Sequence, residues 1–391
     1  MSAITQYAKR AIAGKPGIFG WLYQPYADYQ FRKRQRYLST RYQQLLQDGQ
    51  AVQPGTAFSI GHEPTIRCNL ACKMCYQGDF REDETGVKEL TLEQMIAVYD
   101  RVNVADAKLV GSEIFMRKDI YELLDYLSRR KIPTSLMTNG TLLDAKGIEK
   151  LRRYDNIEWI GFSIDGSEEV HNAIRRRPYA YARTVKAIKD TLPYFTVSIN
   201  SVILRENLDD LTSILELGKE LGIPFVHYIF EEVYSAADIE QTQEILRREM
   251  GWDPTDYEIC TNVREGFEYS FDELVSALQR LRQHGRRLGV YPVFSPDVWS
   301  RRLADYYYGT APQNLHLVCA KLVTDSPTFR LDHLGNVHHC GVIRRPFGNL
   351  LEQPIDEIWN SEEYRRYRRL LMDRRLLPIC KRCCKAAFIQ G

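Results

Sequence analysis

Three cysteines lie close together in the stretch CNLACKMCY, at positions Cys68, Cys72 and Cys75. A structural zinc site is normally closed by four protein ligands and a disulfide uses two thiols, so a set of three matches neither. Three thiolates spaced C-x3-C-x2-C on one loop can instead bind three irons of a 4Fe-4S cube. The fourth iron then stays open to a ligand that the protein does not supply.

A second group of cysteines lies near the C-terminus. It contains two separated pairs, Cys319 with Cys340 and Cys380 with Cys383. Two such pairs are typical of a zinc ribbon or of a second iron–sulfur cluster, and spacing alone does not distinguish them. The two remaining thiols, Cys260 and Cys384, are predicted to be packed in the core, where free cysteine is common.

The composition indicates a folded globular protein. The 391 residues are 44% apolar and 27% charged, and the net charge of +2 gives no reason to expect a nucleic-acid partner. The N-terminus lacks an apolar signal segment, and no apolar run is long enough to span a bilayer. We therefore predict a cytoplasmic protein whose thiols are metal ligands rather than disulfides.

Strand and helix patterns alternate between residues 57 and 232. The predicted strands cover residues 57–65, 107–111, 133–138, 156–164, 195–204 and 224–230, and helical patterns separate them. Six β/α units predict a parallel sheet with right-handed crossovers, in a partial barrel rather than a closed one of eight units. The expected fold class is α/β, a partial (β/α)6 TIM-like barrel followed by a small α+β C-terminal cluster-binding domain.

Changes in composition and in the predicted pattern of helices and strands divide the chain into four regions. We expect an N-terminal helical extension at 1–56, the barrel at 57–232, a helical linker region at 233–316 and the cluster domain at 317–391. The extension is expected to pack on the barrel. The alternative is contact with a membrane surface through Ile18, Phe19, Trp21 and Leu22.

Four motifs directly follow the first four predicted strands. The three-cysteine loop follows the first strand, and GSE at 111–113, TNG at 138–140 and SIDG at 163–166 follow the next three. Because the carboxyl ends of parallel strands meet on one side of the fold, these motifs are expected to share one mouth. Asn139 is expected to be no more than a turn residue.

This ordered set of motifs resembles the radical S-adenosylmethionine (SAM) superfamily. The resemblance implies a SAM-binding 4Fe-4S cluster with Cys68, Cys72 and Cys75 as ligands. It also places Tyr76 where the family's aromatic residue contacts the adenine of SAM.

The resemblance assigns further residues to SAM. Gly111, Ser112 and Glu113 occupy the position of the family's GGEP motif, which receives the methionine amino group. Ser112 and Ile114 depart from that motif, whereas Glu113 keeps the carboxylate that an ammonium group needs. The positions that meet the ribose and methionine parts of SAM, and its carboxylate, are occupied by Ser163, Asp165, Asn200 and Arg175. For each of these the alternative is an ordinary polar residue at a strand end or turn.

The C-terminal region also resembles a known module. Cys319, Gly335 and Cys340 form a C-x15-G-x4-C run, which is followed by GNL, IDEIWNSEEY and the closing CKRC. This order resembles the SPASM/twitch extension of radical SAM enzymes and implies an auxiliary 4Fe-4S cluster on the four paired cysteines. The further cysteines of the full SPASM pattern do not follow, which resembles the shorter twitch type found in dehydrogenases of sugars or cyclitols.

The function implied is that of a radical SAM oxidoreductase. Such an enzyme cleaves SAM reductively to a 5′-deoxyadenosyl radical, with a one-electron donor such as flavodoxin or ferredoxin. The radical removes hydrogen from a small substrate, expected here to be carbohydrate-like or nucleotide-linked, and the auxiliary cluster accepts an electron during dehydrogenation. Epimerisation would instead need a hydrogen donor, for which Cys260 and Cys384 are the candidates. No catalytic base is assigned.

Two other functions fit the same residues. One is a peptide maturase that forms crosslinks or D-residues. The other is a zinc-binding scaffold without catalysis, which the altered GSEI motif would suit.

Overall fold

A curved sheet of nine strands organises the molecule. The computed structural model describes residues 33–46, 51–75, 88–259, 266–298, 302–310, 315–374 and 376–390. The strand order is β11-β10-β1-β2-β3-β4-β5-β6-β8. The central run of the sheet consists of β1 (Phe58–His62), β2 (Val104–Leu109), β3 (Thr134–Thr138), β4 (Ile157–Ser163), β5 (Val197–Ile203) and β6 (Phe225–Phe230). These strands pair in parallel and in chain order, which confirms the predicted partial barrel.

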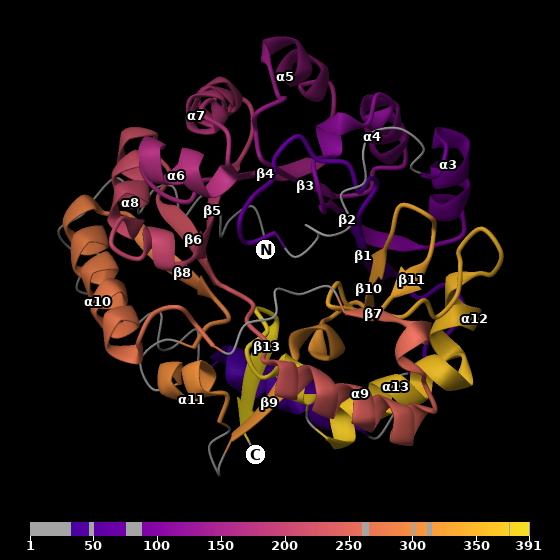
Figure 1. The fold of residues 1–391 in the computed structure, drawn as a ribbon. Helices are drawn as coiled ribbons and strands as arrows, with labels where there is room; N and C mark the ends of the chain where they lie inside the picture. Colours follow the sequence, from indigo (N-terminus) through magenta and orange to yellow (C-terminus); the bar gives the residue numbers. More distant parts are fainter. Residues whose placement is uncertain are drawn as a thin grey trace.

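Helices cover the outer face of this sheet. They are α3 (Leu92–Asp100), α4 (Ile120–Arg129), α5 (Ala145–Leu151), α6 (Glu168–Arg175), α7 (Ala180–Thr191), α8 (Leu211–Glu220) and α10 (Phe271–Leu288). Figure 1 shows them around the outside of the arc of strands. Local sequence supports these helices, since α3 begins with a capping box of Thr91 and Gln94.

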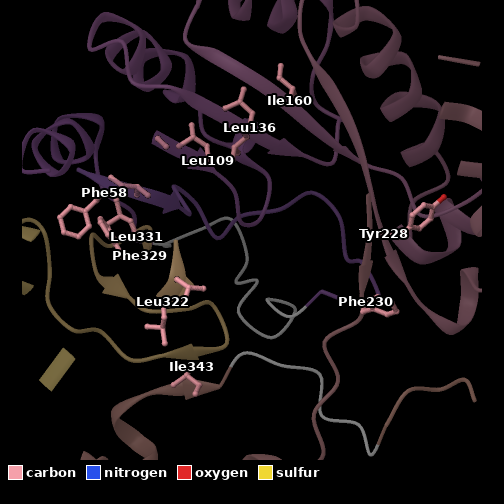
Figure 2. Packing of buried hydrophobic residues seen from close by; sticks show 14 of the residues in the cluster. Phe58, Leu109, Leu136, Ile160, Tyr228, Phe230, Leu322, Phe329, Leu331 and Ile343 are labelled. Carbon is pink, nitrogen blue, oxygen red and sulfur yellow. The ribbon is translucent and has the colours of Figure 1, made fainter. Parts of the chain in front are cut away.

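The core lies between the sheet and these helices. Leu109, Leu136 and Ile160 come from three neighbouring strands, are fully buried and lie along the same face of the sheet (Figure 2). Phe58 extends this layer toward the C-terminal region, because its ring meets that of Phe329 with centroids 5.8 Å apart. The core is therefore continuous from the barrel into the C-terminal third of the chain.

The sheet extends beyond the predicted barrel at both edges. At one edge β8 (Tyr291–Ser295) pairs in parallel with β6. At the other, β10 (Thr328–Leu331) pairs in parallel with β1, and β11 (Val337–His338) pairs antiparallel with β10. Regions predicted as a linker and a separate domain thus complete the sheet, because exposed edges leave backbone groups unpaired. The sheet therefore continues past the predicted boundaries at 232 and 316, and the domain limits themselves stay predictions.

The remaining elements lie at the open side of the arc (Figure 1). They are α9 (Ala236–Met250), β7 (Glu258–Ile259), α11 (Leu303–Tyr308), β9 (Leu315–Cys319), β12 (Ile343–Arg344), α12 (Ile355–Asn360), α13 (Glu362–Asp373) and β13 (Ala386–Gln390). Two small antiparallel pairs form there, β9 with β13 and β12 with β7. Short 3-10 turns occur at Ile114–Met116, Arg205–Asn207, Pro254–Asp256, Ala320–Val323 and Pro378–Cys380.

The N-terminal extension is described only in part. A helix over residues 33–46 contacts the C-terminal region, where the Tyr42 hydroxyl donates to the carbonyl oxygen of Met372 at 2.7 Å. The predicted membrane-contacting residues 18–22 lie outside the described residues. No helix within the described ranges combines the length and apolar character that crossing a bilayer requires.

Candidate active site

The inner face of the sheet is not filled in the way that the outer face is. On β1, Phe58 and Ile60 point outward and are buried, whereas Ser59 and Gly61 point inward and are partly exposed. The same alternation holds on β6, where His227 is among the partly exposed positions. In a closed eight-stranded barrel, interior side chains pack into layers that fill the centre. This inner face therefore remains accessible to a ligand.

The three-cysteine loop follows β1 at the mouth of the barrel. Its three cysteines form no disulfide and are partly exposed. The loop is held to α6, because the Lys73 amide donates to the Ile174 carbonyl at 3.0 Å. The next residue of that helix, Arg175, donates from Nη1 to the sulfur of Cys72 at 3.5 Å. This contact holds the Cys72 sulfur from α6 and fixes its position in the loop. Tyr76 lies outside the described residues.

Arg175 is also bound to Asp165. Its Nε donates to Asp165 Oδ2 at 2.6 Å, and Asp165 Oδ1 accepts from the Val202 amide at 3.1 Å. Burial alone would lower the pKa of Arg175, but Asp165 and Cys72 raise it above its ordinary value. The structure thus links these two residues to each other and to the cysteine loop. Their predicted contacts with SAM stay predictions.

The buried carboxylate of Glu113, in the GSE motif, accepts hydrogen bonds from the end of β3. Its carboxylate accepts from the Thr138 hydroxyl at 2.8 Å and from the Asn139 amide at 2.7 Å. Burial raises the pKa of Glu113 to about 7, even though these hydrogen bonds act in the opposite direction. Glu113 therefore joins the ends of β2 and β3, in addition to its predicted role toward the SAM amino group.

The other two residues of the motif connect it to the end of β1. The Ser112 hydroxyl donates to the Ile66 carbonyl at 2.8 Å, so the departure from the family's glycine makes an additional contact with the cysteine loop. Gly111 has φ +112°, and a Cβ at this position would lie 3.1 Å from the side chain of Glu63. Only glycine combines that conformation with so close an approach.

Asn139 does more than form a turn, which corrects the expectation from sequence. Its Nδ2 donates to Asn69 Oδ1 at 3.0 Å, and its Oδ1 accepts from the Thr141 amide at 2.8 Å. Because Asn69 directly follows Cys68, this network attaches the cysteine loop to the end of β3. The spacing of TNG carried no signal for this contact.

Ser163 and Asn200 are brought together on the inner face. They are register partners on β4 and β5, and Asn200 is in turn the partner of His227 on β6. Asn200 Nδ2 lies 3.2 Å from the Ser198 hydroxyl. The predicted mouth thus has a polar row along three strands, although its contact with SAM stays a prediction.

The second cysteine group is assembled from separate segments. Cys319 ends β9 and Cys340 follows β11. Cys380 ends the short turn after α13, and Cys383 follows that turn. Burial raises the pKa of Cys319 to about 11, and the charge of Cys340 adds to this effect. Burial, Cys340 and Cys319 likewise raise the pKa of Cys380 well above its ordinary value. Thiols gathered in this way become thiolates most readily when a metal supplies positive charge, so the donor set fits a cluster.

These thiols also have hydrogen-bond partners. The amide of Ile343 donates to the sulfur of Cys340, and the amide of Lys385 donates to that of Cys383, both at 3.3 Å. Within the described ranges, no three His, Cys, Asp or Glu side chains lie close enough to hold a single metal ion. A cube of four irons holds its sulfurs farther apart than one zinc ion with Zn–S bonds of about 2.3 Å.

Two side chains lie beside this group. His339 precedes the predicted ligand Cys340, so the sequence allows it either to tune that ligand or to be an ordinary strand residue, whereas Glu232 was not predicted as part of the site. His339 Nε2 lies 3.7 Å from the sulfur of Cys319, and its Nδ1 lies 3.3 Å from the Tyr364 hydroxyl. Glu232 Oε1 accepts from the Cys384 amide at 3.3 Å. Cys384 is partly exposed, so its prediction as a core thiol was wrong, because it lies in the turn before β13 and not in an element packed into the core. Cys260 lies outside the described residues.

Comparison with known proteins agrees with these features. The model of the radical SAM superfamily matches residues 62–218, and that of the SPASM iron–sulfur cluster-binding domain matches residues 324–384. An AdoMet-dependent heme synthase of Methanosarcina barkeri is 28% identical over 321 residues, which cover 79% of this chain and 84% of that protein. The subtilosin biosynthesis protein AlbA of Bacillus subtilis is 26% identical over 200 residues, which cover 48% of this chain and 44% of AlbA.

The fold has solved counterparts as well. The crystal structure of Streptococcus suis SuiB bound to S-adenosylmethionine aligns with a TM-score of 0.56 and 17% identity, covering 83% of this chain and 70% of SuiB. The two matched models imply a SAM-binding 4Fe-4S cluster and an auxiliary cluster, which confirms the predicted cofactors. The individual ligands stay predictions. The chain belongs to the radical SAM superfamily and carries a C-terminal SPASM-type iron–sulfur cluster-binding domain.

Proposed function

We propose that this enzyme abstracts hydrogen from a small substrate held against the inner face of the barrel. The supporting observation is that a three-thiol loop and a four-thiol group flank an inner face whose side chains are partly exposed. When bound, SAM and its cluster supply a 5′-deoxyadenosyl radical, and an auxiliary cluster supplies an electron acceptor. Flavodoxin or ferredoxin is the proposed source of the reducing electron.

The chain's own residues position the parts of this reaction. Cys68, Cys72 and Cys75 are the proposed ligands of the SAM-binding cluster, and Arg175 holds Cys72 from α6. The proposed auxiliary ligands are Cys319, Cys340, Cys380 and Cys383. The proposed SAM contacts are Tyr76, Gly111, Ser112, Glu113, Ser163, Asp165, Arg175 and Asn200.

A carbohydrate-like or nucleotide-linked substrate is the first candidate for turnover. The hydroxyl and amide groups along the inner face, such as those of Ser163 and Asn200, suit a hydroxylated substrate. Reconstituted enzyme, incubated with SAM, reductant and candidate sugars, is expected to form 5′-deoxyadenosine and a ketone in equal amounts. An epimer in place of the ketone would favour hydrogen return by a thiol such as Cys384. Formation of a crosslinked peptide from a peptide substrate would reject the small-molecule proposal.

A peptide maturase is the second candidate, because the chain is similar to AlbA, a bacteriocin biosynthesis protein. Its test is incubation with peptides encoded beside the gene, followed by mass spectrometry for a crosslink or a D-residue.

The zinc-scaffold alternative has a direct test. Two cubes contribute about eight irons per chain, whereas a zinc site contributes about one zinc. Metal analysis of anaerobically purified protein therefore separates a cluster enzyme from a scaffold.

A further inference from the structure

Cationic side chains gather on the inner face below the mouth. Gly61 of β1 is the register partner of both Lys108 on β2 and Arg330 on β10. The three strands thus place Arg330, Gly61 and Lys108 in one row on the same face of the sheet. Gly61 leaves the middle of this row without a side chain, and a Cβ there would lie 3.2 Å from Arg330 Cδ.

Lys108 is the member of this row that is directed toward an aromatic surface. Its Nζ lies 4.9 Å from the ring centroid of Trp159 on β4. Burial and, to a smaller extent, the charges of Lys385 and Arg330 together lower the pKa of Lys108 to about 8, while the Cys384 thiol acts in the opposite direction. Lys108 lies half-buried near a second cation, Arg330, and an anion at this place would offset their repulsion.

The acidic groups near the row are already engaged with other partners. Glu63 forms ion pairs with both Arg330 and Arg344, so its single charge is shared between two guanidinium groups. Asp106, which lies two residues before Lys108 on β2, accepts from the Ser59 hydroxyl at 2.5 Å. Neither contact places a carboxylate on the ammonium group of Lys108.

We propose that Lys108, with Arg330 across Gly61 from it, binds a carboxylate of the substrate, while the ring of Trp159 packs on the substrate's carbon skeleton. This inference rests on the proposed function, since it names the chemical class of the molecule held in the barrel. Lys108 precedes Gly111 by three residues, which corresponds to about 10 Å along a strand. The carboxylate end of the substrate therefore points away from the mouth, and the other end points toward the GSE motif.

This assignment narrows the substrate to an organic acid. Arg330 is already paired with Glu63, so a neutral sugar would leave Lys108 without a carboxylate, whereas a sugar acid or another small carboxylic acid would supply one. The auxiliary cluster is the competing source of negative charge, because the Lys385 amide already donates to the sulfur of Cys383. Lys108 lies on β2 of the barrel and is the residue that separates the two explanations.

The test uses a matched pair of small probes. Glutarate carries two carboxylates, and glutaramide has the same skeleton without charge. Binding of each to the reconstituted enzyme with SAM is measured by calorimetry and by the shift in melting temperature. The variants are Lys108→Met, which keeps the apolar stem, Lys108→Arg, which keeps the charge, and Lys118→Met, which removes an exposed lysine elsewhere.

We expect glutarate to stabilise the wild type, K118M and K108R, and to bind K108M at least about tenfold more weakly, because one partner of a buried charge pair is lost. Glutaramide should stabilise none of them. The inference is overturned if the wild type and K108M bind glutarate equally well. It is also overturned if the wild type binds glutaramide as tightly as glutarate. Loss of SAM binding in K108M without loss of glutarate binding also overturns it, since the row would then serve SAM. Formation of 5′-deoxyadenosine by the wild type tests the proposed function separately.

Discussion

The two cysteine groups are built in opposite ways. The first lies within one loop, between Cys68 and Cys75, and hydrogen bonds from the ends of the neighbouring strands hold that loop. The second is drawn from three segments, at Cys319, Cys340 and the Cys380–Cys383 turn. A ligand set within one loop needs only local structure and leaves a corner open, whereas four thiols from separate segments close around their site. This difference matches the proposal that the first group serves a cosubstrate and the second a protein-enclosed cluster.

The largest expected effects come from removing either cysteine group, which tests the different roles proposed for the two groups. The triple variant C68A/C72A/C75A should lose all formation of 5′-deoxyadenosine and about four of the eight irons per chain. The quadruple variant C319A/C340A/C380A/C383A should lose the other four irons and keep a cluster spectrum that responds to SAM. Iron analysis with electron paramagnetic resonance, with and without SAM, measures both. If the cluster spectrum responds to SAM only in the triple variant, the second cysteine group binds the SAM cluster and the first binds the auxiliary cluster.

The second prediction concerns Arg175, which links the first group to Asp165. Arg175→Met removes one partner of a buried ion pair, so the free energy of unfolding should fall by about 3–5 kcal/mol. Arg177→Met, which changes an exposed neighbour, is the matched control and should stay close to wild type. Chemical denaturation under anaerobic conditions measures the difference. A double variant R175M/D165N should recover part of the loss, and a full loss in both would argue against the pair.

The third prediction is a pH dependence of stability that arises from Glu113 of the GSE motif, which lies at the same mouth as the first group. Burial raises the pKa of Glu113 from 4.5 to about 7, so the folded state binds its proton more tightly than the unfolded state does. The contribution of Glu113 to stability is therefore fully present below pH 4.5 and is lost as the pH rises toward 7. Each unit of pKa difference corresponds to about 1.4 kcal/mol. Glu113→Gln should flatten this part of the stability profile, measured without SAM, and an unchanged slope would contradict the prediction.

The smallest expected effect is a change in the reduction potential of the proposed auxiliary cluster at the second group. His339 lies 3.7 Å from the sulfur of Cys319, and a ring N–H that points at a ligating sulfur raises the reduction potential of a cluster. His339→Leu should therefore make the midpoint potential of the auxiliary cluster more negative, while His339→Gln, which keeps an N–H donor, should shift it less. A redox titration followed by electron paramagnetic resonance measures this. Identical potentials in all three proteins would show that the contact does not tune the cluster.

The local parts of the site were predictable because their signals lie in short stretches. The spacing of Cys68, Cys72 and Cys75 and the order of the strand-end motifs depend on a few neighbouring residues and on the period of the strands. The contact of Arg175 with Cys72 joins residues 103 positions apart, and no sequence pattern indicated it. Asn139 was missed for the same reason, since its partner Asn69 is 70 positions away.

The sequence by itself determined the two cysteine groups, the alternation of strands and helices and the resemblance to a superfamily. The tertiary structure decided how the barrel is completed and what its inner face carries. It paired β10 with β1 and β8 with β6, and it placed Arg330 and Lys108 on either side of Gly61. The physical reason is that spacing within a loop is encoded by adjacent residues. Contacts between strands hundreds of residues apart depend instead on which edges and apolar faces remain to be covered when the whole chain packs.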